Sequence, residues 1–416
     1  MKKVNDGLVE VGDVILTTST WGVSKLIRAA TRSDISHAMV CVADRSVIDA
    51  TGDGVHARNV QRLAFPEECA VHLLRPVVSL DADKIKTLTD FLRSRIGTQY
   101  VDLRELAKTM IGGSVKWSEK QFCSRLVAQA FEAAGIKLVT DPNYCSPEAL
   151  RKSNALKEIE NCTLPFTAEE ALAWERLEDL PQLMREATNF ILDGARQVHP
   201  GLQTFDQMNA LLLRRPDLDD DFTHLLQASG YLQLWETEQQ QNPWQYDVRI
   251  MDRMPYAQIE EYCWSVLASA DVKPHRFMLN RGGYLVFERQ SGLRFFQLMR
   301  ELYDHLLAQQ EKRLRTAALW LESKGLLAPA MQRPLIPHSS EWFAALRAWD
   351  PIKADATEHI INLAGSHEVC SVCGDEPASD YRLEEIHRLA GGIDTLRLCS
   401  DCVAIRKRGG EKFRAI

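Results

Sequence analysis

The pattern of apolar and polar residues divides the first third of the chain into short strands and helices. Runs of apolar, β-branched residues predict strands at about 14–18, 37–43, 46–51, 54–60 and 70–75. Apolar residues at helical spacing predict helices over 21–30, 81–95, 102–111 and about 120–135. Short strands with helices packed on one side are typical of an α+β domain with a small antiparallel sheet.

The last of these predicted helices carries a cysteine in its opening turn. Ser118 can cap its start, Gly135 can end it in a left-handed turn, and Cys123 lies in the first turn. Backbone N–H groups at a helix start can stabilise a thiolate. This position therefore suits a nucleophilic cysteine, although a free cysteine can equally be a small buried hydrophobe.

A histidine and several carboxylate or hydroxyl side chains lie on the preceding predicted hairpin. His37 begins the strand at 37–43, and the strand at 46–51 returns antiparallel to it. Because side chains alternate along a strand, His37 can share a face with Asp49, Thr51 or Asp53, depending on the turn. A nucleophile, an imidazole and a group that orients the imidazole are the minimum set for thiol acyl chemistry.

Residues from about 12 to 149 resemble the circularly permuted branch of the NlpC/P60 superfamily, the YiiX-like papain-fold hydrolases related to the lecithin:retinol acyltransferase group. The similar segments are Gly12–Leu16, Ser24–Ile27, Thr31–Ser33, Ser36–His37, Val47–Ala50, Gly97–Tyr100 and Phe122–Val127. In such proteins the histidine precedes the cysteine, as it does here. The resemblance implies a permuted papain-like fold with Cys123 as nucleophile, His37 as general base and acid, and Asp49 as the orienting residue.

Two positions depart from this family's pattern. Phe122 stands where the family often has tyrosine, and Asp49 stands where it often has glutamate. Aspartate reaches less far, so Thr51 and Asp53 remain alternatives for the orienting role. For the oxyanion donor the sequence leaves three candidates, which are Gln121, Ser124 and the backbone N–H of Cys123.

We predict three domains, with boundaries at 1–152, 153–365 and 366–416. The middle domain is rich in helical patterns, with a capping box at Thr167–Glu170, a polar loop at Thr237–Pro243 and three tryptophans that we expect in the core, Trp235, Trp244 and Trp264. Its scattered histidines have no metal-ligand spacing. We interpret this domain as a structural or docking module that binds a protein partner or restricts access to the cysteine site.

The last fifty residues contain two CxxC pairs, at Cys370, Cys373, Cys399 and Cys402. Each pair places two thiolates in one tight turn, and four thiolates complete the tetrahedral shell of a structural Zn²⁺. Gly374 suits the turn after the first pair. The 25 residues between the pairs are somewhat more than usual for such a site, and His367 and His387 are alternative ligands.

The residues after Cys402 carry a local charge of +4, from five basic residues against Glu411. Such a tail can touch nucleic-acid phosphates, or it can be a solvated terminus. The net charge of −7 on the whole chain argues against extensive electrostatic binding to nucleic acid. Nucleic acid is thus an unlikely partner whose contact would be confined to this tail.

The composition, with 45% hydrophobic and 26% charged residues, is that of a soluble globular protein. We predict no signal peptide and no membrane span, because the amino-terminal stretch soon turns acidic and no run approaches eighteen apolar residues. We therefore expect a cytoplasmic protein, in which Cys41, Cys69, Cys145, Cys162 and Cys263 are reduced and buried.

These observations together predict a thiol hydrolase that forms a thioester at Cys123 and cleaves an amide, isopeptide or acyl bond. The substrate is a peptide, a protein or a lipid acyl group, and the lack of an apolar docking stretch favours peptide or amide cleavage. The alternatives are a lipid acyl hydrolase or an acyltransferase like the lecithin:retinol group, and an inactive adaptor that binds protein or nucleic acid through the helical and zinc modules.

Overall fold

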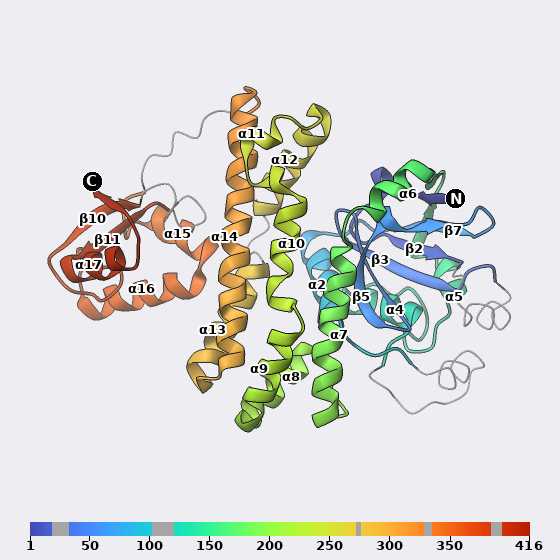
Figure 1. Cartoon of the computed structure of the whole chain (residues 1–416), viewed down its shortest axis with the longest axis horizontal. Coiled ribbons are helices and arrows are strands. Elements are labelled where there is room, and N and C mark those ends of the chain that lie inside the picture. The colour runs from blue at the N-terminus through green and yellow to red at the C-terminus, as the bar shows by residue number, and fades with distance from the viewer. Residues whose placement is uncertain (19–32, 102–119, 272–275, 328–334, 384–392) are drawn as a thin grey trace. The chain divides into compact units, whose positions relative to one another are not determined.

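The computed structural model describes residues 1–18, 33–101, 120–271, 276–327, 335–383 and 393–416. The chain forms two compact units, Met1–Thr237 and Glu238–Ile416 (Figure 1). These units do not test the three-domain division, whose boundaries after residues 152 and 365 stay predictions. The predicted helices at 21–30 and 102–111, the predicted cap Ser118 and the alternative ligand His387 lie outside the described residues.

The first unit is built around a six-stranded antiparallel sheet in the order β5-β4-β3-β2-β7-β8. Its strands are β2 (Val14–Thr17), β3 (His37–Ala43), β4 (Ser46–Thr51), β5 (Gly54–Asn59), β7 (Val71–Pro76) and β8 (Leu156–Ile159). The first five match the predicted strands closely. The sequence did not predict β8, because this edge strand has only four residues and two of them are exposed charges.

A second, three-stranded sheet in the order β6-β1-β9 lies against one face of the first. It consists of β1 (Lys2–Val4), β6 (Ala64–Phe65) and β9 (Thr163–Pro165). Val4 of β1 is fully buried with Ile15 and Met39 of the larger sheet. The start of the chain therefore closes this face of the sheet.

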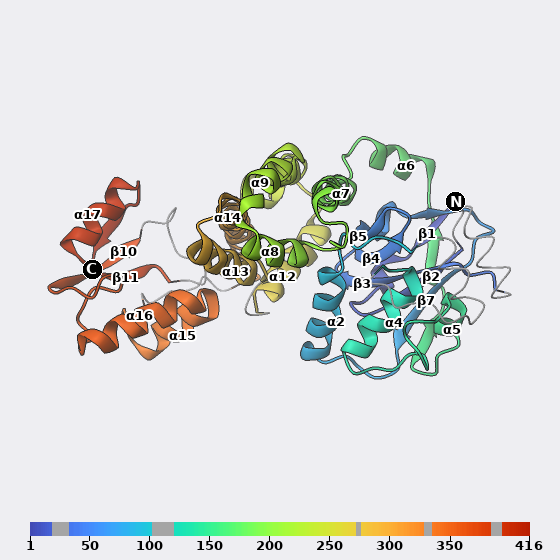
Figure 2. The same ribbon diagram turned by 90° about the horizontal axis from the view of Figure 1, so that it is seen from below.

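The helices α2 (Ala82–Ser94), α4 (Cys123–Ala133) and α5 (Pro147–Arg151) pack on the other face (Figure 2). Leu88 and Leu92 of α2 and Leu126 of α4 share one buried cluster with the strand residues. Helix α4 ends at Ala133, and Gly135 just beyond it has a φ of +77°, which gives the predicted left-handed turn. The arrangement confirms an α+β fold with antiparallel sheets.

The described part of the first unit also contains the helices α6 (Ala168–Glu175), α7 (Leu180–Val198), α8 (Phe205–Arg214) and α9 (Asp219–Ala228). Thr167 and Glu170 form the predicted capping box of α6. The next helix, α7, has its own N-cap residue, Asp179. Helix α7 packs beside β5, where Arg196 donates to the carbonyl oxygen of Gly97 at 2.7 Å.

The second unit contains a helical part formed by α11 (Val248–Met251), α12 (Tyr256–Asp271), α13 (Arg276–Ser291) and α14 (Arg294–Ser323). Helix α10 (Leu234–Gln241) precedes them. The predicted loop at Thr237–Pro243 is wrong over its first five residues, because the run of glutamate and glutamine there continues α10 to Gln241. No helix within the described residues is both long enough and apolar enough to span a bilayer.

One predicted core aromatic is not in the core. Trp264 is 41% exposed, whereas its neighbour Cys263 is fully buried with Trp320 of α14. Consecutive residues of a helix point about 100° apart, so α12 buries Cys263 and turns Trp264 outward. Trp244 packs against the same cluster as predicted.

The end of the chain forms a small α+β module. It contains α15 (Ser340–Trp349), α16 (Pro351–Ala364), β10 (Ala378–Leu383), β11 (Thr395–Cys399), α17 (Ser400–Arg408) and β12 (Phe413–Ala415), with the strand order β11-β10-β12. Trp342 of α15 and Ala354 of α16 are buried in one cluster with Leu396 and Leu398. This core contains residues from both sides of the predicted boundary at 365.

Candidate active site and metal centre

The structure places Cys123 at the first residue of α4, where the helix begins against the start of β3. Phe122 is the N-cap in extended conformation, and Cys123 is only 3% exposed. Its Sγ lies 4.0 Å from the carbonyl oxygen of Ser36. The first N–H groups of a helix have no partner within the helix, so those of α4 are free to stabilise negative charge at the helix start, where Cys123 lies.

The segment before the cysteine is held by a buried arginine. Arg125 donates to the carbonyl oxygens of Lys120 at 2.8 Å and Asn143 at 3.0 Å. Its guanidinium also lies 4.4 Å from the ring centroid of Phe122. These contacts fix the turn into α4, so they hold the cysteine at a set position.

His37 bridges the cysteine and a carboxylate. Its Nε2 lies 2.7 Å from Oδ2 of Asp49, and the side chain of Cys123 is near enough to raise the pKa of the ring. Burial lowers the pKa of His37, but the interactions with Asp49 and Cys123 outweigh burial and raise it to about 10. The surroundings therefore stabilise the positively charged form of the imidazole next to the sulfur.

Asp49 is a carboxylate with no exposed surface. Its Oδ2 accepts hydrogen bonds from His37 and, at 3.2 Å, from Nη1 of Arg58. Burial alone would raise the pKa of Asp49, but the hydrogen bond from His37 and the charges of His37, His56 and Arg58 hold it well below its usual range. A buried carboxylate that stays ionised can orient and stabilise an imidazolium.

The two alternative orienting residues lie elsewhere. Oγ1 of Thr51 accepts from the backbone N–H of Asp53 at 3.3 Å. The side chain of Asp53 is 46% exposed and lies 3.8 Å from Nε of Arg185. Of the three predicted candidates, Asp49 is thus the one that the structure brings to His37.

Two of the candidate oxyanion donors are engaged with other groups. The hydroxyl of Ser124 donates to the carbonyl oxygen of Cys145 at 2.7 Å, in a fully buried position. The side-chain nitrogen of Gln121 donates to Oε1 of Gln129 at 2.9 Å. The backbone N–H of Cys123, at the helix start, is the third candidate, and the Gln121 amide has a second N–H that can also donate.

Sequence reasoning did not assign three residues that the structure brings to this site. Tyr100 pairs with Gln121 in an isolated bridge, and burial together with the charges of Cys123 and Asp49 raises its pKa. Nε2 of His56 lies 3.5 Å from Oδ1 of Asp49, and Arg58 contacts the other oxygen. Because side chains alternate along a strand, the sequence already indicates that His56 and Arg58 lie on the same face. That this face is the one with Asp49 follows only from the pairing register of the two strands.

The four predicted cysteine ligands gather at one point of the second unit. The sulfur atoms of Cys370, Cys373, Cys399 and Cys402 all lie within 4.8 Å of one another. The Sγ of Cys373 is 3.5 Å from that of Cys399 and 3.6 Å from that of Cys402. The predicted turn after the first pair is present, since Gly374 has a φ of +81° and donates to the carbonyl oxygen of Cys370.

This arrangement fits a tetrahedral metal ion. Zinc–sulfur bonds of about 2.3 Å place the thiolates of a tetrahedral site about 3.8 Å apart. The spacings of 3.5 Å and 3.6 Å from the Cys373 sulfur are close to this value. The donor set of four sulfurs is that of structural metal sites. The cluster can therefore hold a metal ion through its own four residues, without either alternative histidine.

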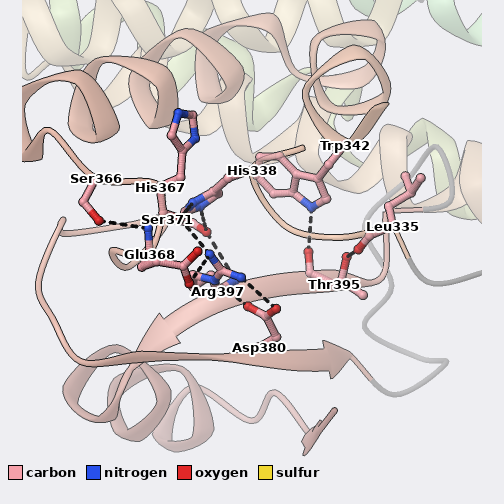
Figure 3. A network of polar contacts seen from close by, with 10 residues as sticks. All are labelled: Leu335, His338, Trp342, Ser366, His367, Glu368, Ser371, Asp380, Thr395 and Arg397. Carbon is pink, nitrogen blue, oxygen red and sulfur yellow. Dashed lines mark hydrogen bonds and ion pairs between the residues drawn. The ribbon is translucent and has the colours of Figure 1, made fainter. Parts of the chain in front are cut away.

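A polar network ties the cysteine loop to the helices before it (Figure 3). His338 lies 2.7 Å from both the carbonyl oxygen of His367 and Oγ of Ser371, a residue within the first CxxC pair. Arg397 of β11 binds Asp380 at 2.7 Å and Glu368 at 2.8 Å. The first metal loop is thus held by protein contacts as well as by its cysteines.

These geometries define a permuted papain-like domain followed by a mostly helical region with a four-cysteine cluster. In a comparison with family models, residues 8–189 match that of the permuted papain-like amidase enzymes, the YaeF/YiiX, C92 family. This match supports a hydrolase of papain-like type, and its range includes β8 and half of α7.

Comparison with solved structures found a similarity to the crystal structure of metalloprotein yiiX from Escherichia coli O157:H7. The sequence identity is 22%, the match covers 36% of this chain and 96% of that chain, and the TM-score is 0.30. None of the curated proteins matches this chain.

Proposed function

We propose that the first unit is a cysteine hydrolase that cleaves an amide or isopeptide bond of a peptide or protein. The observation that carries this proposal is the continuous chain from Cys123 through His37 to the buried carboxylate of Asp49. A nucleophile, a base and an orienting group in contact are the parts of a thiol acyl-transfer site. The match to papain-like amidases supports the same bond class.

In the proposed reaction, His37 takes the thiol proton and the Cys123 thiolate attacks the carbonyl carbon. The backbone N–H of Cys123 donates to the oxyanion that forms, an interaction worth about 3 kcal/mol in comparable sites. The His37 imidazolium then protonates the leaving amine, and a thioester remains on Cys123. His37 next removes a proton from water, which attacks the thioester and releases the carboxylic acid.

The test is the rate of Cys123 alkylation by iodoacetamide as a function of pH, followed by mass spectrometry. We expect rapid alkylation of the native chain well below pH 8.5, about the pKa of an ordinary thiol. His37→Ala should abolish this low-pH reaction. Slow alkylation that rises only near the ordinary thiol pKa in both proteins would overturn the proposal.

Turnover then distinguishes hydrolysis from its alternatives. Peptide amides, isopeptides and acyl esters should be tested with the native chain and with Cys123→Ala, with and without an added amine or alcohol acceptor. Release of a free acid only by the native chain supports a hydrolase. Acyl transfer to the acceptor would indicate an acyltransferase, and cleavage of acyl lipids alone would indicate a lipid hydrolase. If no substrate is turned over and Cys123 reacts as an ordinary thiol, the protein would be an adaptor.

We also propose that the ion bound by Cys370, Cys373, Cys399 and Cys402 is a structural Zn²⁺. Four thiolates saturate a tetrahedral zinc and leave no open position for a substrate or water. The ion would therefore stabilise the carboxy-terminal module and take no part in the chemistry at Cys123.

A further inference from the structure

A second histidine lies against the carboxylate of the proposed active site. His56 of β5 is directly opposite Asp49 of β4 in the strand register, and its Nε2 is 3.5 Å from Oδ1 of Asp49. Within the described part of the chain, this oxygen has no hydrogen-bond partner, although it is completely buried. The state of His56 therefore decides how much of the Asp49 charge remains for His37.

The contacts of His56 identify which ring nitrogen carries the proton. Its Nδ1 lies 3.1 Å from the carbonyl oxygen of Gly54, and a carbonyl only accepts, so Nδ1 must be the donor. In the neutral ring Nε2 then has the lone pair. Nη1 of Arg185, which can only donate, lies 3.5 Å from this nitrogen.

Nε2 of His56 is thus equally distant from a cation and from a carboxylate. With Nε2 unprotonated, Arg185 can donate to it. With Nε2 protonated, His56 could donate to Asp49, but two donors would then face each other at Arg185. The charged groups around this ring are Asp49, Arg58 and Arg185, and burial together with the two arginines lowers the pKa of His56 against the effect of Asp49.

Arg185 belongs to α7, which lies beyond the strands and helices that carry the cysteine and its partners. Its side chain is 22% exposed and lies 3.8 Å from Oδ2 of Asp53. Asn189, one turn further along α7, donates to the carbonyl oxygen of Asp53 at 3.0 Å. Two contacts to the same turn therefore fix the arginine above His56.

We propose that Arg185 is a positioning residue of the cysteine site, which keeps His56 a neutral acceptor and so reserves the Asp49 carboxylate for His37 and Arg58. The proposal rests on the proposed function for its catalytic consequence. Without Arg185, His56 can take a proton and donate to Asp49. Two imidazolium rings would then share one carboxylate, and the positive charge on His37 would be less stable.

The direct test is ring ¹⁵N NMR of histidine-labelled full-length chain, with the His56 signals assigned by their loss in His56→Gln. We expect a neutral Nδ1–H ring in the native protein. In Arg185→Gln the pKa of His56 should rise by about one unit, a tenfold gain in proton affinity. Arg176→Gln, which removes an exposed arginine of the same unit, is the charge-matched control, and Arg185→Lys should restore much of the native behaviour.

The second test is the pH profile of Cys123 alkylation in the same variants. Arg185→Gln should shift the acid limb of the profile, where His56 can bind a proton, by up to about one pH unit and leave the rate unchanged at higher pH. In a His56→Gln background, Arg185→Gln should have no further effect. A general loss of structure would instead lower the rate at all pH values and in both backgrounds.

The outcomes separate the two proposals. If His37→Ala abolishes low-pH alkylation but Arg185→Gln moves neither the His56 signals nor the profile, the role of Arg185 is wrong and the cysteine hydrolase stands. If His56 responds to Arg185 while Cys123 reacts as an ordinary thiol in every variant, the proposed function fails. An imidazolium His56 in the native protein at neutral pH would overturn the role of Arg185.

Discussion

Nε2 of His37 and Oδ2 of Asp49 meet at 2.7 Å, with the carboxylate completely removed from solvent. Asp49→Asn keeps the size of the side chain and removes its charge, so the imidazolium loses its closest anion. We predict a fall in kcat/KM of about 100-fold for any substrate that the native chain turns over, within the range for a perturbed acid–base group. Steady-state kinetics of the purified variant measures this.

Thr51→Val is the matched control for that substitution. Thr51 is on the same strand, but its hydroxyl contacts the backbone of Asp53 and not His37. We expect this variant to keep nearly native activity. A larger loss in Thr51→Val than in Asp49→Asn would mean that the hydroxyl, and not the carboxylate, orients the imidazole.

The charge on His37 predicts a pH-dependent contribution to stability. Its pKa in the folded chain is raised from 6.5 to about 10, so the folded state binds the proton more tightly than the unfolded state. The stability from this proton is fully present below about pH 6.5 and is lost as the pH rises towards 10. Urea unfolding of the native chain and of His37→Gln should therefore differ most at low pH and converge as the pH rises.

A difference that grew with pH between 7 and 9 would contradict this expectation. It would mean that the folded chain favours the neutral ring. The same comparison with His72→Gln is a control, because His72 pairs at 2.6 Å with Glu158, a carboxylate that is 53% exposed. Solvent screens such a pair, so its contribution should be smaller at every pH.

Within the first unit, Gly97 lies where α7 packs, and a larger residue at this position should have a steric cost. Its φ is +89°, and an added Cβ would come within 2.2 Å of Cδ1 of Leu192 on α7. We expect Gly97→Ala to lower the free energy of unfolding by about 2 kcal/mol, from backbone strain and the displacement of Leu192. Urea unfolding followed by circular dichroism measures the change.

Gly135→Ala isolates the backbone part of that cost. Gly135 also has a positive φ, of +77°, but nothing lies within 4 Å of an added Cβ. Its substitution should cost only about 1 kcal/mol. Equal losses in the two variants would show that Leu192 moves aside freely and that α7 is not tightly packed at Gly97.

Metal removal should affect the carboxy-terminal module alone. We predict one zinc per chain by elemental analysis of the purified protein, and its loss in Cys399→Ser, because three thiolates hold the ion less tightly than four. After chelation, hydrogen exchange should accelerate in Ala378–Leu383 and Thr395–Cys399 and stay unchanged in His37–Thr51.

Cys263→Ser is the control for the metal experiment, since Cys263 is a fully buried cysteine outside the cluster. It should leave the zinc content unchanged. A native chain without zinc would contradict the proposed ion. Retained zinc in Cys399→Ser would contradict the four-cysteine ligand set.

The sequence by itself determined the features that depend on neighbouring residues. The periodic apolar residues after Cys123 require a helix, and Gly135 ends it as predicted. The strands from 37 to 51 follow from β-branched residues around a short turn. The CxxC spacing brings each pair of thiolates together locally, so that part of the metal cluster was predictable.

The tertiary structure decided what depends on long-range pairing and packing. Asp49, not Thr51 or Asp53, meets His37, although the β3–β4 register pairs Asp49 with Met39, two residues from the histidine. The contact is thus a diagonal one on the same face, and only the packed side chains show it. Arg185 reaches His56 from a helix more than a hundred residues later. Local sequence carries no information on such contacts, because burial and charge balance are fixed only when the elements pack.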